Sequence, residues 1–125
     1  MVKFFVCEIC GNVVELINDH GAPLSCCGTN MVFLTPNTVE ASQEKHLPQV
    51  SRAEDGLKVK VGSVLHPMGN EHYIDFIYVK SAKGFQRVKL EIEGSPEAQF
   101  CCVGDGPVEV YAYCNLHGMW KTELK

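Results

Sequence analysis

The chain has 125 residues, of which 46% are hydrophobic and 21% are charged, and its formal net charge is −4. This length suits one globular domain, or a small metal-held module followed by a compact domain of roughly 90 residues. The composition excludes a disordered chain, and the mildly acidic balance excludes a basic nucleic-acid-binding surface.

The apolar runs are all shorter than the ~18 residues that a membrane-spanning helix needs. The run from Met1 to Val6 reaches Cys7 and Glu8 before it could form the apolar part of a signal peptide. We therefore expect a cytoplasmic protein that binds neither membrane nor nucleic acid. Because cytosolic thiols are kept reduced, the seven cysteines are expected to be metal ligands or free thiols rather than disulfides.

The first predicted domain covers residues 1–36, where short strand-like runs occur at Phe4–Val6, Val13–Ile17 and Met31–Leu34. A piece of this size cannot bury a sufficient core. We expect a metal bound by its cysteines to hold it together.

Four cysteines in this domain form a Cys-x-x-Cys pair and, after fifteen intervening residues, an adjacent pair: Cys7, Cys10, Cys26 and Cys27. Four thiolates close a tetrahedral shell around zinc or a single iron. The spacing leaves open a structural zinc site and a disulfide between the adjacent cysteines. Zinc would only stabilise the fold, whereas iron could also carry an electron.

The second predicted domain covers residues 37–125 and follows a linker at 35–43. Strand-like runs are expected at Leu57–Val61, Tyr73–Lys80, Arg87–Glu93, Val108–Tyr113 and Met119–Leu124. Short strands separated by glycine-containing turns predict an immunoglobulin-like antiparallel β-sandwich, so the fold class of the whole chain is all-β.

Five further candidate ligands lie at expected strand ends and loops: His46, His66, His72, Cys114 and His117. Imidazole and thiolate together suit iron, copper or zinc. Four imidazoles and one thiolate leave one position of an octahedron open, which favours chemistry over a purely structural role. A thiolate opposite that position would push electron density toward a small, electron-poor oxygen species.

One histidine and two cysteines are not assigned to either predicted metal site. His20 lies in the loop between the two cysteine pairs and is expected to be a surface residue. Cys101 and Cys102 lie in the apolar run Gln99–Val103, where we expect buried cysteines that behave as small hydrophobic residues.

The chain resembles the desulfoferrodoxin family over essentially its whole length. The Cys-x-x-Cys and Cys-Cys pairs resemble the family's desulforedoxin-like amino-terminal domain. The segments EKHLP at 44–48, KVGSVLHPM at 60–68, EHYI at 71–74 and YCNLHGMW at 113–120 resemble those that build its second metal site.

This resemblance implies two irons in each chain. One would have rubredoxin-like character and be bound by Cys7, Cys10, Cys26 and Cys27. The other would be the catalytic iron, bound equatorially by His46, His66, His72 and His117 with Cys114 axial. The implied activity is superoxide reductase: ferrous iron gives one electron to superoxide, and hydrogen peroxide leaves. A rubredoxin-like donor would re-reduce the iron, the protein would protect against oxidative stress, and the implied assembly is a homodimer.

Glu44 and Lys45 match the family's catalytic pair. The resemblance implies that Glu44 occupies the sixth position of the oxidised iron and that Lys45 lies beside the open site. A carboxylate is a hard ligand that should prefer ferric to ferrous iron. A lysine close to the site can attract an anion although the whole chain is acidic, because distant charges are screened.

Three other functions compete with this interpretation. An electron-transfer protein with a cupredoxin-like copper site would need two histidines and one cysteine, which four available histidines fit poorly. A module with zinc in both sites would need neither Glu44 nor Lys45. A superoxide dismutase would release dioxygen as well as peroxide.

Overall fold

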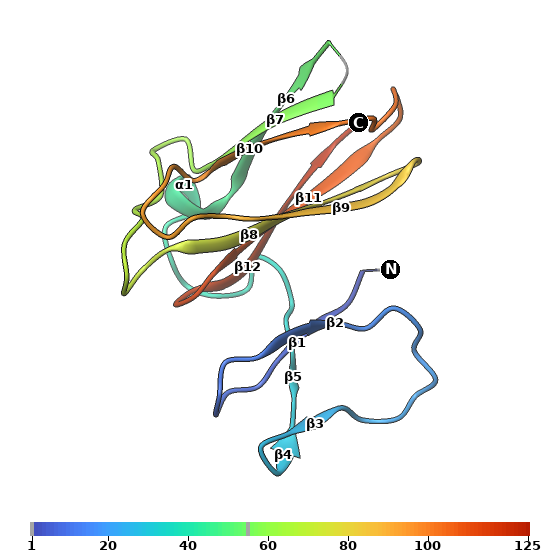
Figure 1. Ribbon diagram of the computed structural model, residues 1–125, viewed down its shortest axis with the longest axis vertical. Coiled ribbons are helices and arrows are strands. Elements are labelled where there is room, and N and C mark those ends of the chain that lie inside the picture. Colours follow the sequence, from blue (N-terminus) through green and yellow to red (C-terminus); the bar gives the residue numbers. More distant parts are fainter. Residues whose placement is uncertain (1, 55) are drawn as a thin grey trace. The chain divides into compact units, whose positions relative to one another are not determined.

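Strands make up both units of the chain in the computed structural model, which describes residues 2–54 and 56–125 (Figure 1). The contacts divide the chain into Met1–Thr35 and Pro36–Lys125. Met1, where the first predicted domain begins, lies outside the described residues. The predicted all-β class is confirmed. No helix in the described part of the chain is both long and apolar enough to cross a membrane.

The first unit is a small sheet with a separate hairpin. Strand β1 (Phe4–Val6) pairs on either side with β2 (Val13–Glu15) and β5 (Val32–Phe33), and β3 (Ser25–Cys26) pairs with β4 (Thr29–Asn30). Phe4 and Cys7 are the buried residues among those described in this unit. So small a core cannot stabilise the unit alone, which agrees with a metal-held module.

The second unit consists of two antiparallel sheets. The strand order is β10–β7–β6 in the first and β12–β11–β8–β9 in the second, as expected for a sandwich. A one-turn helix, α1 (Gln43–His46), precedes the first strand. The strands are β6 (Pro48–Ala53), β7 (Gly56–Val61), β8 (Ile74–Ser81), β9 (Gly84–Lys89), β10 (Glu97–Cys101), β11 (Val108–Cys114) and β12 (Gly118–Leu124).

The core of this unit follows from the alternation of side chains along its strands. In β7, Leu57, Val59 and Val61 are buried whereas Lys58 and Lys60 are exposed. Strands β8 and β11 are central in their sheet and are buried along nearly their whole length. Apolar side chains of β7, β8, β10 and β11 form one cluster.

Most strand predictions are confirmed to within one or two residues. The predicted runs at 57–61, 73–80, 108–113 and 119–124 correspond to β7, β8, β11 and β12. The run Arg87–Glu93 was placed wrongly, because β9 begins at Gly84 and ends at Lys89. Beyond that strand the N–H of Leu90 still donates to the carbonyl of Asp75, and the chain then turns at 91–94.

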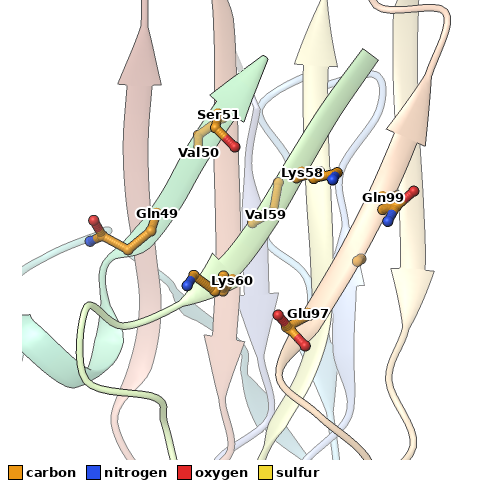
Figure 2. Close-up of a pocket in the computed structure, with 9 residues that line it drawn as sticks. Gln49, Val50, Ser51, Lys58, Val59, Lys60, Glu97 and Gln99 are labelled. Atoms are coloured by element: carbon orange, nitrogen blue, oxygen red, sulfur yellow. The ribbon is translucent and has the colours of Figure 1, made fainter. Parts of the chain in front are cut away.

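The outer face of the three-stranded sheet is polar. In one row across the strands Lys58 lies between Gln99 and Ser51. In the next row Lys60 lies between Glu97 and Gln49. Figure 2 shows the hollow that these side chains line. None of them belongs to a cluster of candidate metal ligands, so this face corresponds to the solvated side of the sandwich.

Glu109 is the centre of a charged cluster on the four-stranded sheet. Its carboxylate lies 3.3 Å from the Lys121 ammonium and 3.7 Å from that of Lys80, and it accepts a hydrogen bond from the Tyr111 hydroxyl. Burial raises the pKa of Glu109, but the Tyr111 and Lys121 hydrogen bonds outweigh burial and hold it below its usual value.

We predict that Glu109→Gln lowers the free energy of unfolding at pH 7 by about 1 kcal/mol. A carboxyl whose pKa is depressed in the folded state stabilises the protein above its unfolded pKa, about 4.3. This stabilisation is lost as the pH falls through the folded pKa, so the variant and the parent should converge in acid. Denaturant unfolding between pH 7 and 3 measures the difference. Glu123→Gln, which changes a more exposed partner of Lys121, is the control and should cost less.

Candidate metal centres

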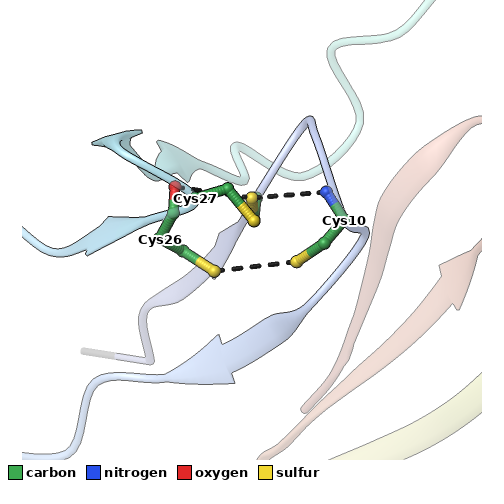
Figure 3. Close-up of side chains that lie close together, drawn as sticks. Cys10, Cys26 and Cys27 are labelled. Atoms are coloured by element: carbon green, nitrogen blue, oxygen red, sulfur yellow. Dashed lines mark hydrogen bonds between the residues drawn. The ribbon is translucent and has the colours of Figure 1, made fainter.

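The first cluster gathers all four cysteines of the first unit. The sulfurs of Cys7, Cys10, Cys26 and Cys27 lie within 4.8 Å of one another. Figure 3 shows the Cys10 and Cys26 sulfurs facing each other, 3.6 Å apart. Four sulfurs at about 2.3 Å from one ion would be separated by roughly 3.8 Å, so the cluster has the dimensions of a tetrahedral thiolate site.

Local backbone conformation brings these sulfurs together. The N–H of Cys10 points at the Cys7 sulfur at 3.5 Å, as in a tight Cys-x-x-Cys turn. Cys26 ends β3, and Cys27 then adopts a left-handed conformation with φ of 54°. This unusual conformation lets two neighbouring side chains reach one point instead of alternating.

The thiols affect one another's ionisation. The Cys10 N–H lowers the pKa of Cys7 to about 6. Hydrogen bonding with the Cys10 side chain raises the pKa of Cys26 and raises that of Cys27 to about 12. Forming all four thiolates therefore needs a compensating cation. The donor set fits iron or zinc equally well.

The second cluster is a square of four imidazoles in the second unit. Neighbouring ring centroids are 4.7 Å apart for His46 and His66, 4.5 Å for His66 and His72, 5.1 Å for His72 and His117, and 4.9 Å for His117 and His46. His46 and His72 are 6.2 Å apart and so occupy opposite corners. The four neighbouring pairs are all edge-on.

The Cys114 sulfur lies against this square. It is 3.5 Å from His66 Nε2 and 3.8 Å from His117 Nδ1, which belong to opposite corners. Because His46 and His72 occupy the other two corners, a sulfur nearly equidistant from His66 and His117 lies off the plane of the square. The ligand atoms of His46, His72, Cys114 and His117 are within 4.8 Å of one another, and His66 Nε2 approaches that of His46 to 3.2 Å.

Backbone carbonyls fix which imidazole nitrogen faces inward. His46 Nδ1 is 2.7 Å from the Ser42 carbonyl, and His66 Nδ1 is 2.7 Å from the Pro67 carbonyl. A carbonyl oxygen only accepts, so each Nδ1 carries the hydrogen and each Nε2 presents a lone pair to the cluster. Such outer hydrogen bonds are typical of histidines that bind metal.

Burial favours the neutral form of three of these imidazoles, those of His46, His66 and His72. Desolvation lowers the pKa of His66 to about 4 and also lowers those of His46 and His72. His72 Nε2 is buried and has no hydrogen-bond partner among the described residues. Inward-facing imidazole nitrogens with a buried sulfur form a donor set that suits iron, copper or zinc. Neighbouring nitrogens 3.1 and 3.2 Å apart have the spacing of adjacent ligands about 2.1 Å from one ion.

The ends of the strands bring these ligands to one end of the sandwich. His46 ends α1 just before β6, His66 follows β7, and His72 precedes β8. Cys114 is the last residue of β11, and His117 lies in the turn to β12. Strands that are adjacent and antiparallel place these starts and ends together.

A loop after β7 holds α1 in place. The Val64 N–H and the Ser63 hydroxyl both donate to the Glu44 carbonyl, at 3.1 and 3.2 Å. Gly62 has φ of 89°, and a Cβ there would lie 2.8 Å from the Lys45 carbonyl oxygen. Glycine is needed at this point because the two backbones touch. Gly62 is visible in the segment 60–68, but from the sequence we predicted only a turn there and not this close contact.

Asn115 ties two ligand segments together. Its side-chain oxygen accepts from the Tyr73 N–H at 2.8 Å, and its side-chain nitrogen donates to the Glu71 carbonyl at 3.0 Å. These two residues flank His72, and Asn115 itself follows Cys114. We did not predict this role for Asn115, although its position between the predicted ligands Cys114 and His117 indicated that it lies close to the site.

Trp120 packs against the cluster. Its ring stacks on His46 with centroids 4.9 Å apart, and its indole N–H donates to the His117 carbonyl at 3.1 Å. The contact restrains two corners of the square.

The structure places Glu44 and Lys45 on α1, beside His46. Both side chains are exposed, and the Glu44 carboxylate is not part of the donor cluster among the described residues. The Lys45 charge contributes to lowering the pKa of His46 and His72.

One expectation about the remaining residues was wrong. His20 is exposed, as predicted. Cys101 and Cys102 are also exposed, whereas we expected them to be buried. The positive φ of 62° at Cys102 breaks the alternation that would have turned one of the two side chains inward.

Family profiles match both units of the chain. A profile described as the desulfoferrodoxin N-terminal domain matches residues 2–34, and the desulfoferrodoxin profile matches residues 38–123. A desulfoferrodoxin of Syntrophotalea carbinolica is 43% identical over 98% of this chain and 96% of its own length. One from Nitratidesulfovibrio vulgaris is 39% identical, with 97% and 95% covered.

Two solved structures share the fold. The superoxide reductase of Treponema pallidum is 35% identical and has a TM-score of 0.80, with 98% of both chains covered. A superoxide reductase of Giardia intestinalis is 27% identical and has a TM-score of 0.57, with 66% of this chain and 98% of that chain covered.

We predict that Asn115→Ala lowers the free energy of unfolding of the second unit by about 2 kcal/mol, because two hydrogen bonds to the His72 segment are lost. Loosening His72 should also weaken metal binding at the second cluster by roughly 10–100-fold. Denaturant unfolding and competition with a chelator measure the two effects.

The matched control is Asn115→Asp, which keeps the acceptor for the Tyr73 N–H and loses the donor to Glu71. It should fall between the parent and Asn115→Ala. Equal metal affinity in all three proteins would contradict a positioning role for Asn115.

Proposed function

Because the chain belongs to the desulfoferrodoxin family, we propose that it is a superoxide reductase that works at its four-histidine, one-cysteine cluster. The observation that carries the proposal is the square of imidazoles with a buried sulfur on one side of its plane. Five donors in this arrangement leave one position of an octahedron for a small ligand. The similarity to a superoxide reductase over 98% of both chains supports the same activity.

We propose that His46, His66, His72, His117 and Cys114 would together hold the catalytic iron. When bound there, ferrous iron would supply the single electron that superoxide takes up. The reaction then balances as superoxide, one electron and two protons giving hydrogen peroxide. As a ligand, the Cys114 thiolate would increase the electron density that the iron offers to the substrate.

Lys45 would draw superoxide to the open position. The chain carries a net charge of −4, which repels an anion at long range. Charges beyond a Debye length of about 8 Å are screened at physiological salt, so the nearest charge dominates. Lys45 lies close enough to perturb His46 and His72, and it therefore affects the potential at the site.

Glu44 would bind at the open position in the oxidised resting state. Its carboxylate is a hard anionic ligand, which prefers the ferric ion. The backbone of Glu44 is held by Ser63 and Val64, while the side chain is exposed. A fixed backbone with a free carboxylate suits a ligand that must come and go.

The four-cysteine cluster would hold the second iron, as a staple for the first unit and as a rubredoxin-like electron carrier. Its four thiolates fill a tetrahedral shell, so no substrate position remains. We propose that a rubredoxin-like protein supplies electrons, that the chain works as a homodimer, and that it is cytoplasmic, where seven thiols outside disulfides remain reduced.

The function is tested with superoxide generated in the presence of a limiting reductant. A reductase should form as many peroxide molecules as superoxide molecules consumed, without dioxygen, and should stop when the reductant is exhausted. A dismutase would form half as many and would evolve dioxygen. Metal analysis should find two irons per chain; zinc in both sites or copper in the histidine site would overturn the proposal. Cys114→Ser is the matched variant and should abolish the reaction.

We predict that Lys45→Ala lowers the rate of reaction with superoxide by about tenfold at low salt. Its rate should also depend less on ionic strength than that of the parent. Stopped-flow or pulse measurements between low and high salt give both values. Lys83→Ala is the control, since Lys83 lies in the β8–β9 turn at the other end of the sandwich. An unchanged rate in Lys45→Ala would refute the steering role.

A further inference from the structure

Met68 lies in the loop that joins two of the candidate ligands, His66 and His72. Its side chain is partly exposed, and it packs against the core cluster that contains Cys114. The other methionine of the second unit, Met119, is only 2% exposed. Met68 is therefore the thioether of this unit that solvent can reach.

The Met68 sulfur closes the base of the loop. It accepts a hydrogen bond from the Ile74 N–H at 3.3 Å, and Ile74 is fully buried and pairs with Cys114. The Gly69 N–H donates to the His72 carbonyl at 3.1 Å and closes the loop nearer its tip. A thioether is a weak acceptor, so the bond to Ile74 depends on the sulfur staying where the packing places it.

The loop also lines a hollow that is open to solvent. Its volume is about 470 Å³, and both Met68 and His72 contribute to its wall. A molecule as small as hydrogen peroxide can enter this hollow and reach the sulfur while the protein stays folded. Because His72 is one of the candidate ligands, peroxide released at the metal would be formed beside the hollow.

We propose that hydrogen peroxide oxidises Met68 to methionine sulfoxide and that this modification loosens the segment of His72. The sulfur gives an electron pair to one oxygen of the peroxide, the O–O bond breaks, and the other oxygen leaves as water with both hydrogens. The thioether loses two electrons and the peroxide gains them. This step rests on the proposed function only for the source of the peroxide.

Oxidation changes both contacts of the sulfur. A sulfoxide is polar, so it packs poorly against the apolar cluster. The added oxygen needs space where the sulfur already contacts the Ile74 N–H, so the side chain has to move and the base of the loop opens. Lost contacts around a ligand typically weaken metal binding by roughly tenfold or more. Methionine sulfoxide reductases reverse the oxidation, so the site can recover.

The test adds hydrogen peroxide directly to the metal-loaded protein, so the result does not depend on whether the chain reduces superoxide. Peptide mapping by mass spectrometry should find Met68 oxidised about tenfold faster than Met119, because Met119 is buried. In competition with a chelator, the protein should lose one of its metal ions as Met68 is oxidised. Treatment with methionine sulfoxide reductases should restore the lost binding.

Three variants separate this effect from general oxidation. Met68→Leu keeps an apolar side chain of similar volume that cannot be oxidised, so it should retain its metal in peroxide. Met68→Gln places a polar group against the core and should weaken metal binding about tenfold without peroxide. Met31→Leu is the matched control, because it removes a partly exposed methionine of the first unit and should behave like the parent.

Equal oxidation of Met68 and Met119 would overturn the proposal. So would metal loss at the same rate in the parent and in Met68→Leu, which would assign the loss to oxidation of the thiolates. Metal binding by Met68→Gln that equals that of the parent would show that the loop does not depend on this side chain.

Discussion

Nitrogen lone pairs face one another at the buried end of the sandwich, and the rest of the second unit is arranged around this constraint. The Nε2 atoms of His46 and His66 are 3.2 Å apart, and neither carries a hydrogen because each Nδ1 donates to a carbonyl. Two acceptors at this distance cannot hydrogen-bond to each other. The arrangement is stable only if a cation lies between the rings.

The surrounding structure prevents the imidazoles from escaping this arrangement. The carbonyls of Ser42 and Pro67 hold two rings, Trp120 stacks on one of them, and Asn115 fixes the segment of His72. None of these groups belongs to the cluster of candidate ligands. They supply the orientation that the ligands require, and the backbone contact at Gly62 places the helix that carries His46.

The sequence predicted the strands and the residues of both clusters far better than it predicted the contacts that hold them. Alternating residues such as those of 57–61 reveal a strand because burial is periodic, and donor types reveal a site because their chemistry is specific. Asn115 and Gly62 act through backbone atoms of distant segments, which no local pattern records. Cys101 and Cys102 were misplaced because one residue with positive φ reverses the alternation, and such a residue is rarely a cysteine.

The ligand residues of the two clusters differ in their exposure to solvent, and this difference suits the two clusters to different roles. Cys10 and Cys27 are exposed, which suits the electron-carrying role that we propose for the four-cysteine site. Cys114, His46 and His66 are almost completely buried, while Lys45 and Glu44 nearby are exposed. This arrangement suits the proposed approach of a small anion on the side of α1, away from the buried Cys114 sulfur. The exposure of the ligand residues thus supports the proposed division between reaction at one site and electron transfer at the other.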